Sequence, residues 1–417
     1  MTNEVDERTR DEVQPRPLWR NGNFRLLWGG QAVSVLGTQV STLALPLLVL
    51  ALTGSPAQAG LIAAAHFLPY VMVSLPAGAL IDRWNRKAVM IGCDVARFLA
   101  FGSVPLAYAL GHLTAAQLYV VALVEGTAFV FFNITQSASL PRVVPAGQLL
   151  QANAATMAAM SVAAFLGPGL GGVLISFART TVVGAAVAYL LDSLSYLASV
   201  ISLAFIRIPF QVSRLPATQS SLSADIRDGV HFLWGQRLLR TLALLTLSTN
   251  IFLGPIDLAV IVLARDSLHA DARAIGIIFS LGSVGALLGS VVASRLRMRL
   301  RVGRIIVGAT ALEALALPVL ATAASPLTLL VAWGLLTAAV SIYSVTVESY
   351  RLALTPDALQ GRVNSVAGLL NFSCTPLGIA AGGLLLGRVG PRAELWLIAL
   401  GMGSIVSVAA YSRLRRM

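Results

Sequence analysis

Twelve long apolar stretches follow one another along the chain, and this pattern restricts it to a helical fold embedded in a lipid bilayer. A bilayer core about 30 Å thick is crossed by a helix of roughly 20 apolar residues. Every stretch is long enough for one such crossing. The predicted membrane spans are 27–51, 58–80, 88–110, 116–138, 153–176, 182–206, 241–264, 274–294, 303–323, 326–350, 365–387 and 393–412.

The composition identifies lipid as the solvent of most of this chain. Apolar residues make up 57% of the 417 positions and charged residues only 12%. A soluble domain carries roughly a quarter charged residues, and single soluble cores stop growing at about 250–300 residues. We therefore exclude a water-soluble fold and expect the lipid bilayer as a permanent partner.

The basic residues indicate how the chain is oriented. A net charge of +12 can signal nucleic-acid binding, but here the basic residues form short clusters between apolar spans, so we expect no nucleic-acid partner. Of the 30 basic residues, 24 lie in segments on one side of the predicted spans and 5 on the other. The positive-inside rule then places both termini in the cytoplasm. Because arginine far outnumbers lysine, as in GC-rich bacteria, we expect a bacterial cell membrane.

The sequence carries no pattern typical of a cofactor, a metal site or ATP hydrolysis. Cys93 and Cys374 both lie inside apolar spans, and the four histidines have no metal-ligand spacing. A phosphate-binding G-x-x-x-x-G-K-[ST] loop does not occur, and neither does a cleavable leader at the polar N-terminus. A membrane-embedded enzyme would need a catalytic cluster at one face, and a sensor would need an appended domain. We expect neither, and no cofactor.

The chain contains an internal repeat. A shift of 211 residues superimposes seven positions of the first half on identical residues of the second. The matched pairs are Gly78/Gly289, Arg86/Arg297, Pro145/Pro356, Asn153/Asn364, Gly167/Gly378, Gly171/Gly382 and Gly172/Gly383. Parallel repeats of six helices are one transporter architecture. The predicted organisation is a tail (1–26), a six-helix half (27–206), a linker with an amphipathic surface helix (207–240), a second half (241–412) and a tail (413–417).

The loop after the second span resembles a known family signature. It reads Gly78-Ala-Leu-Ile-Asp82-Arg83-Trp-Asn-Arg86-Lys87 and matches every fixed position of the major facilitator pattern G-x-L-x-D-R-x-x-R-K. A positive-inside cluster alone explains the basic residues but not the aspartate at its spacing from the glycine. The resemblance implies the all-α major facilitator fold, with twelve membrane helices in two six-helix halves, and secondary transport by a monomer.

The resemblance also implies roles for two residues of this loop. Gly78 would let two helices approach closely, and Asp82 would lie near the N-terminus of a helix of the other half, where the helix dipole favours an anion. That helix is span 365–387, so Asp82 would latch the outward-facing state. The second copy keeps Gly289 but has Ala293 in place of the aspartate, which makes a latch there doubtful.

The fifth span resembles the G-P-x-x-G-G element of antiporter-type members. It reads Gly167-Pro168-Gly-Leu-Gly171-Gly172, although a glycine that normally precedes it is Ala163 here. Small residues also serve ordinary helix packing in membranes, so the element favours export over import without excluding an importer of a nutrient.

Three shorter runs narrow the resemblance within the superfamily. They lie at 23–31, 192–196 and 360–365 and look like the branch that contains macrolide-efflux and enterobactin-exporter proteins. This branch implies a small-molecule cargo such as a drug, a siderophore or another secondary metabolite, exported by proton antiport and driven by the proton gradient. The alternative is a major-facilitator importer, which differs in direction but not in fold.

Four charged residues inside or near the spans have a candidate partner one helical turn away. An ionisable residue in the middle of a bilayer costs roughly 2.5–3.5 kcal/mol on insertion scales, so each needs an explanation. Asp94 and Arg97 are three residues apart on one helix face, and so are Glu348 and Arg351. Local ion pairs are the simplest account of all four.

Two further acids lie near the middle of spans that the resemblance implies to be peripheral in the fold. Asp192 falls in span 182–206 and Glu313 in span 303–323. Neither has a basic residue within a turn. Pairing with neighbouring helices is therefore at least as good an account of them as a part in transport.

Two carboxylates are stronger candidates for transport. Glu125 lies near the middle of span 116–138, and Asp257 lies in span 241–264; both spans line the central cavity in the family fold. Neither has a basic neighbour within a turn, and a carboxyl group removed from water holds a proton more readily. We therefore expect Glu125 to carry the coupling proton or to meet a cationic cargo, with Asp257 as the second candidate. Four polar residues could supply hydrogen bonds in the cavity, although contacts between helices are the simpler account: Gln31, Ser34, Asn133 and Asn250.

Overall fold

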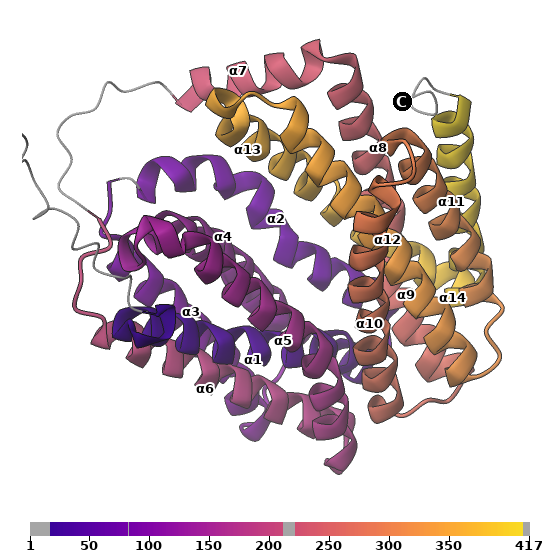
Figure 1. Ribbon diagram of the computed structural model, residues 1–417. Coiled ribbons are helices and arrows are strands. Elements are labelled where there is room, and N and C mark those ends of the chain that lie inside the picture. The colour runs from indigo at the N-terminus through magenta and orange to yellow at the C-terminus, as the bar shows by residue number, and fades with distance from the viewer. Residues whose placement is uncertain (1–16, 82, 212–221, 412–417) are drawn as a thin grey trace, which may run out of the picture.

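A computed structural model describes residues 17–81, 83–211 and 222–411, and within these ranges every regular element is a helix. The α-helices are α1 (Gly22–Thr53), α2 (Pro56–Ile81), α3 (Arg86–Ala109), α4 (Ala115–Val143), α5 (Leu149–Phe177), α6 (Thr181–Phe205), α7 (Leu222–Gly235), α8 (Arg237–Leu253), α9 (Ile256–Val262), α10 (Ala272–Arg297), α11 (Val302–Ala321), α12 (Pro326–Leu354), α13 (Asp357–Ser373) and α14 (Thr375–Tyr411). Short elements are η2 (Leu18–Arg20), η3 (Ala146–Gln148) and the π-helix η4 (Leu263–Ser267). Figure 1 shows how they pack.

These helices form the twelve predicted spans of the major facilitator fold. Eleven helical segments of the described chain are long and apolar enough to cross a membrane, and the last, Val366–Tyr411, contains two spans. They are separated at Gly390, whose φ of 78° belongs to the left-handed region that glycine adopts at little cost. The seventh span is broken as well, because α8 ends before Gly254 and Pro255 and α9 continues it.

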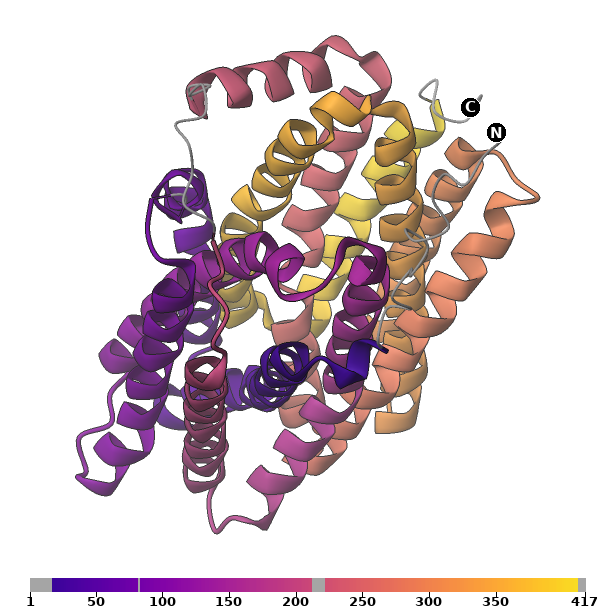
Figure 2. The same ribbon diagram turned by 60° about the vertical axis from the view of Figure 1, so that its left-hand side comes forward.

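The two halves are separate bundles joined by the linker. Helices α1 to α6 form the first bundle, and α8 to α14 form the second, as the colour change across Figure 1 shows. Within the linker, α7 occupies the position of the predicted amphipathic helix and lies across one end of the second bundle (Figure 2). Its Leu233 side chain is 1% exposed and packs with Val363 and Val366 of α13. We call this end of the molecule, which also carries the C-terminus of α14, the linker end.

The main contacts between the halves are two pairs of helices at the opposite end, which we call the hairpin end, and α2 also contacts α13 through Tyr70 and Phe372. Helix α2 packs on α14, and α5 packs on α10. A Cβ atom at Gly60 would lie 2.6 Å from the Cα of Gly383, and one at Gly276 would lie 3.0 Å from the Cα of Gly172. Only glycine permits such backbone contact. The bundle is therefore closed at the hairpin end.

These contacts correct one part of the repeat predicted from the sequence. The 211-residue shift holds for α5 and α14, because Gly172 and Gly383 occupy matching positions in the two contacts. Helices α2 and α10, however, both have 26 residues and end 216 positions apart. The pairing of Gly78 with Gly289 was wrong for this reason. A Cβ atom at Gly289 would meet Ala338 of α12, whereas one at Gly78 would meet nothing within 4 Å.

Candidate functional site

A central cavity of about 300 Å³ lies between the halves, toward the closed hairpin end. Both bundles contribute to its wall, the first through α1 to α6 and the second through α9, α10 and α14. Its lining includes Thr38 and Thr42 of α1, His66 of α2, Glu125 of α4 and Asp257 of α9. Apart from these polar groups the wall is mostly apolar, which is typical of a small-molecule site.

Glu125 lies in the cavity wall between two basic side chains. It is only 3% exposed, and its Oε2 atom contacts the Nδ1 atom of His66, while its Oε1 atom lies 3.7 Å from Nη2 of Arg97. Both partners come from other helices, so neither is visible at helical spacing in the sequence. The prediction that Glu125 faces the cavity is confirmed.

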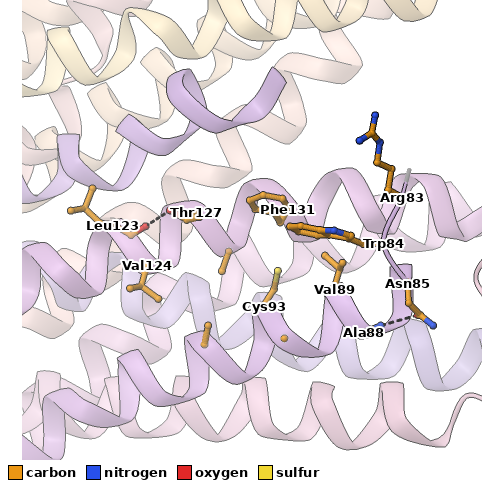
Figure 3. Close-up of a pocket in the computed structure, with 13 residues that line it drawn as sticks. Arg83, Trp84, Asn85, Ala88, Val89, Cys93, Leu123, Val124, Thr127 and Phe131 are labelled. Atoms are coloured by element: carbon orange, nitrogen blue, oxygen red, sulfur yellow. Dashed lines mark hydrogen bonds between the residues drawn. The ribbon is translucent and has the colours of Figure 1, made fainter. Parts of the chain in front are cut away.

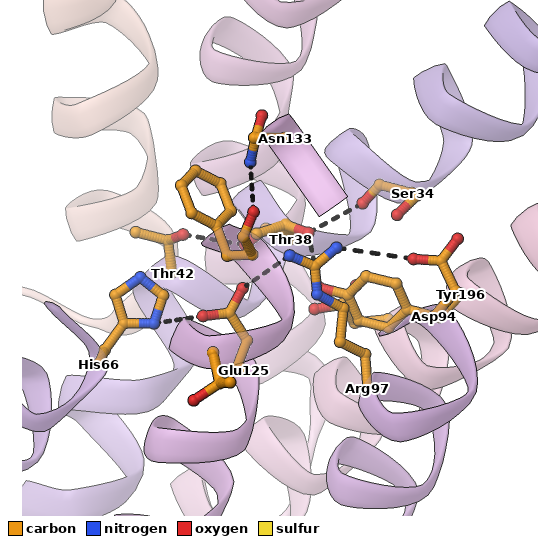
Figure 4. A network of polar contacts seen from close by, with 12 residues as sticks. Ser34, Thr38, Thr42, His66, Asp94, Arg97, Glu125, Asn133 and Tyr196 are labelled. Carbon is orange, nitrogen blue, oxygen red and sulfur yellow. Dashed lines mark hydrogen bonds and ion pairs between the residues drawn. The ribbon is translucent and has the colours of Figure 1, made fainter. Parts of the chain in front are cut away.

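Arg97 is held between two carboxylates and an aromatic cage (Figure 4). Its Nη1 atom lies 3.6 Å from Oδ1 of Asp94, so the predicted pair within α3 is present alongside the contact with Glu125. Its guanidinium carbon lies 5.8, 5.4 and 5.3 Å from the ring centroids of Phe129, Phe132 and Tyr196 respectively. Such cation–π contacts stabilise a cation removed from water.

The local sequence explains why these groups meet. Glu125, Phe129 and Phe132 of α4 have the spacing i, i+4, i+7 and therefore lie on one helix face, as do Asp94 and Arg97 at i, i+3 on α3. Because α3 packs beside α4, the charged groups of the two faces lie together, next to the aromatic rings of α4.

Hydroxyl groups of α1 and α6 complete the network. Ser199 donates a 2.7 Å hydrogen bond to Oδ2 of Asp94, and the hydroxyl groups of Thr38 and Tyr196 lie 2.9 Å apart. A buried polar network is stable only when its members are partnered in this way. We call Asp94, Arg97, Glu125 and His66 the charge cluster. His66 was missed because the sequence analysis treated it as one of four scattered histidines, although an ionisable residue inside a predicted span was a signal.

Asp257 faces the same cavity from the second half. It lies in the first turn of α9, directly after the break at Gly254 and Pro255, where the helix dipole favours a carboxylate. Its side chain is exposed to the cavity, and among the described residues it takes part in no ion pair. The predicted cavity position of Asp257 is therefore confirmed.

The four polar candidates do not line the cavity. Gln31 and Ser34 are buried on α1, and the carbonyl oxygen of Ser34 accepts a hydrogen bond from the Thr38 hydroxyl group. Asn133 donates to the Phe129 carbonyl oxygen of its own helix at 2.9 Å, and Asn250 is half-buried on α8. The hydrogen bonds at Ser34 and Asn133 stay within their own helices, so a role of the four residues in contacts between helices remains a prediction.

The other acids inside the membrane differ in whether their carboxyl groups have hydrogen-bond partners. Asp192 on α6 is fully buried, and its Oδ1 atom accepts a 3.1 Å hydrogen bond from Ser195 of the same helix, so pairing with a neighbouring helix stays a prediction. Glu313 on α11 is equally buried, but its carboxyl oxygens have no hydrogen-bond partner among the described residues. The same is true of Glu394 on α14, an acid that the sequence analysis did not single out.

Glu348 belongs to the protein surface. Its carboxylate accepts hydrogen bonds of 2.6 Å from Arg351, and its side chain is 53% exposed. The predicted local pair at the end of α12 is confirmed, and it has no connection to the cavity.

The basic residues of the family loop bind helix ends. Nη1 of Arg86 donates to the Ala138 carbonyl oxygen at 2.8 Å, and Nζ of Lys87 donates to the Ile206 carbonyl oxygen at 2.7 Å. Cations are favoured at helix C-termini, so both side chains fasten α4 and α6 to the start of α3. Arg83 is exposed. Asp82 lies outside the described residues, and the close helix approach expected at Gly78 was wrong for this conformation, because α2 contacts the other half near Gly60 instead.

The glycines of the fifth span face two different helices. Cβ atoms at Gly167 and Gly171 would collide with the backbone of α1 at Gln39 and Val40, whereas one at Gly172 would collide with α10. The amide nitrogen of Gly169 donates to the hydroxyl oxygen of Ser280 on α10 at 2.7 Å. Pro168 lines the cavity. This motif therefore holds α5 against its own half and against the other half at once.

Sequence comparison identifies relatives over most or all of the chain. Residues 15–417 match the family described as transmembrane secretion effector. The multidrug efflux pump Tap of Mycobacterium tuberculosis (strain ATCC 25618 / H37Rv) is 28% identical over 386 residues, which is 88% of each protein. Macrolide efflux protein A of Streptococcus pyogenes is 24% identical over 207 residues, half of each protein.

Solved structures share the fold at lower identity. A bacterial homologue of the iron transporter ferroportin in its inward-facing state matches with a TM-score of 0.72 and 18% identity, covering 94% of this chain and 99% of that one. The outward-facing state of a bacterial ferroportin homologue gives a TM-score of 0.59 at 20% identity, covering 93% of this chain and 98% of that one. The two-bundle architecture is thus the one that membrane transporters use.

Three findings agree: the family match spans nearly the whole chain, the twelve spans form two bundles, and a polar cavity lies between them. The relatives at similar length are transport proteins by name. The chain therefore belongs to the transmembrane secretion effector family, and it is a membrane transporter of the major facilitator superfamily, not an enzyme.

Proposed function

We propose that this transporter exports a small, apolar, cationic molecule in exchange for protons. The single observation that carries the proposal is the charge cluster, which places the buried Glu125 between His66 and Arg97 in the wall of the central cavity. Intramembrane ionisable groups of this kind mark proton or substrate pathways.

The charges of the cluster support an exchange mechanism. Two carboxylates, Asp94 and Glu125, face one permanent cation, Arg97, so the cluster holds one negative charge in excess. A proton shared between Glu125 and His66 can balance that charge, and so can a cationic cargo in the cavity. Because unbalanced charge is costly in a low-dielectric site, binding of one favours release of the other. Mutual exclusion of this kind is what proton antiport requires.

The rest of the cavity supports the proposed cargo class. Phe67, Tyr189 and Phe279 contribute aromatic surface to the wall, and Asp257 adds a carboxylate from the opposite half. A cation with an apolar body is matched by these features, since rings attract cations and apolar walls favour burial. The volume of about 300 Å³ is at the lower end of small-molecule sites.

The proposed direction of transport depends on which end of the protein faces the cytoplasm. The linker end carries the loop with Arg83, Arg86 and Lys87, and by the positive-inside rule it faces the cytoplasm of a bacterial cell. The closed hairpin end then faces outward, and the conformation is the inward-facing one, ready to load from the cytoplasm. The names of the relatives, a multidrug efflux pump and a macrolide efflux protein, favour export.

We propose alternating access by movement of two units, 27–206 and 241–412, within one monomer. The small-residue contacts at Gly60 and Gly276 would open while the linker end closes. One-for-one exchange of a monovalent cation for a proton moves no net charge, so the pH difference and not the membrane potential drives it. A pH difference of one unit is worth about 1.4 kcal/mol and supports roughly a tenfold cargo gradient.

The test is transport of ethidium, an apolar cation, into inside-out vesicles acidified in their lumen. The wild-type protein should accumulate ethidium only while the proton gradient lasts, and Glu125→Gln should lower the rate about tenfold or more. Glu348→Gln, which alters an exposed carboxylate remote from the cavity, should transport normally. Undiminished transport by Glu125→Gln would contradict the proposed coupling, and proton-driven loss of ethidium from the lumen would contradict export.

A further inference from the structure

A second hollow lies on the outer face of the first half, between α3 and α4 (Figure 3). Its volume is about 920 Å³, and its walls come from α3, α4 and the loop between α2 and α3. Apolar side chains make up most of the wall. The hydroxyl group of Thr127 is already bonded to the Leu123 carbonyl oxygen at 2.7 Å, so it adds no unsatisfied polar group. We call this feature the α3–α4 groove.

The floor of the groove is built from small residues. Ala88, Gly92 and Ala96 follow one another at intervals of four on α3, which places them in one row along the helix. A Cβ atom at Gly92 would meet nothing within 4 Å. The row therefore leaves an open channel along α3 rather than a contact with another helix.

The groove faces the hydrocarbon of the bilayer. Val95 and Leu99 on α3 are 37% and 62% exposed, and Leu123 on α4 is 38% exposed. In a chain that spans the membrane, large apolar side chains with such exposure are in contact with lipid tails. The central cavity lies on the inner side of the same two helices, where Glu125 meets Arg97.

One end of the groove has the chemistry of the membrane interface. Trp84 is 47% exposed, and its ring stacks on Phe131 with a centroid distance of 6.1 Å and an angle of 18°. Arg83 extends beyond that ring, away from the row of apolar side chains (Figure 3). Arg86 and Lys87 bind carbonyl groups, whereas Arg83 forms no side-chain hydrogen bond or ion pair with the described residues. Tryptophan and arginine are typical of interfaces.

The length of the groove matches one leaflet. From Asn85 to Ala96 the helix rises roughly 16 Å at 1.5 Å per residue, which is about half of a 30 Å hydrocarbon core. An acyl chain that starts at the Trp84 ring would therefore end near the bilayer midplane, beside Val124.

We propose that the α3–α4 groove binds one anionic phospholipid from the leaflet at the linker end. An acyl chain lies along Ala88, Gly92 and Ala96, and the headgroup phosphate pairs with Arg83. The guanidinium group binds phosphate through two parallel hydrogen bonds, which a zwitterionic headgroup with its own ammonium group satisfies less well. The site is distinct from the transport cavity, so this inference does not depend on the proposed function.

Native mass spectrometry of the purified full-length protein tests the proposal, with phosphatidylglycerol and phosphatidylcholine of identical acyl chains as probes. The wild-type protein should retain one phosphatidylglycerol at roughly tenfold lower lipid concentration than phosphatidylcholine. Arg83→Gln should remove that preference. Gly92→Leu fills the groove and should weaken retention of both lipids about tenfold.

Matched controls come from the second half. Gly308 of α11 is also exposed and open, and Arg304 is an exposed arginine on the same helix, so Gly308→Leu and Arg304→Gln should bind lipid as the wild type does. A melting temperature measured for each variant separates lost binding from lost folding, and Arg83→Gln leaves the helix floor intact.

Three results would overturn the proposal. The first is equal retention of the two lipids by the wild-type protein, and the second is unchanged phosphatidylglycerol binding in both Arg83→Gln and Gly92→Leu. The third is a Gly92→Leu protein that retains phosphatidylglycerol normally but no longer transports ethidium, because the groove would then be a path for cargo.

Discussion

The two halves of this transporter share one helix arrangement but have different side chains at corresponding positions. Helices α4 and α12 each have 29 residues and correspond at a shift of 211 positions, so Glu125 in the first half corresponds to Leu336 in the second. Glu125 meets a histidine and an arginine, whereas Leu336 is 3% exposed in an apolar core. Each half also has a threonine–tyrosine hydroxyl pair, but between helices that do not correspond: Thr38 of α1 lies 2.9 Å from Tyr196 of α6, and Thr246 of α8 lies 2.8 Å from Tyr343 of α12.

The buried acids of the halves differ in the same way. In the first half Asp94, Glu125 and Asp192 all have partners, while in the second half Glu313 and Glu394 have none among the described residues. A partnered acid can keep its charge in a dry environment, but an isolated one is far less costly when neutral. The proposed mechanism therefore predicts proton coupling in the first half, with the second half contributing Asp257 to cargo binding.

The largest expected effect comes from removing the cation of the charge cluster. Arg97→Met leaves Asp94 and Glu125 buried without their shared partner and should destabilise the protein by about 3–5 kcal/mol, seen as a large fall of the melting temperature in detergent. Arg351→Met breaks the exposed pair with Glu348 in the second half and should cost at most about 1 kcal/mol. Equal losses in the two variants would contradict the difference between the halves.

The next effect concerns the contact between the halves. Gly60→Val forces α2 away from Gly383 and should destabilise the closed hairpin end by about 1–3 kcal/mol. In Gly78→Val the new side chain would extend into open space, so the stability of the hairpin end should not change.

Disulfide formation between cysteines at positions 57 and 387 reports on this closure, because a Cβ atom at Gly387 would lie 3.6 Å from that of Ala57. In a background lacking Cys93 and Cys374, cross-linking should fall several-fold with Gly60→Val and stay unchanged with Gly78→Val. The opposite ranking would place the contact between the halves elsewhere.

A smaller effect is expected at the carboxylate that the second half offers to the cavity. Asp257→Asn removes one charge from the cargo site but none from the charge cluster, so the KM for ethidium should rise about tenfold while transport stays proton-driven. Asp266→Asn, on the exposed turn that follows, serves as the control. Loss of proton coupling in Asp257→Asn would move the coupling role to the second half.

The smallest effect is expected at the isolated acid of α11. Glu313→Gln replaces a buried carboxyl group that lacks a described partner with an isosteric neutral group, so stability should change by less than about 1 kcal/mol and ethidium transport should persist. Thermal melting and vesicle transport measure both quantities. A transport defect as large as that of Glu125→Gln would show that the second half also carries coupling protons.

Most of the architecture could be predicted from the sequence because it depends on quantities that are local in the chain. Apolar length fixed the number of spans, and the loop from Gly78 to Lys87 indicated the fold. The glycines of the fifth span marked a helix that packs closely on two sides. Helix register was harder: the 211-residue offset does not describe α2 and α10, because α10 begins and ends five residues later than that shift from α2 implies.

The charge cluster could be predicted only in part, because its contacts join different helices. Asp94 and Arg97 are visible as a pair at helical spacing, and Glu125 was recognised as a cavity residue. Their convergence depends on the packing of α4 against α3 and α2, which no spacing in the sequence encodes. His66 was overlooked for the same reason: its partner is 59 positions away, on another helix.

The most direct test of the central claim is proton release on cargo binding. The purified protein in weakly buffered detergent solution, with a pH-indicator dye, should release roughly one proton for each ethidium cation bound, because cargo and proton compete for the same excess charge. Glu125→Gln should bind ethidium without releasing a proton, and Glu313→Gln should behave as the wild type. Ethidium binding without proton release in the wild-type protein, or release that persists in Glu125→Gln, would contradict the account.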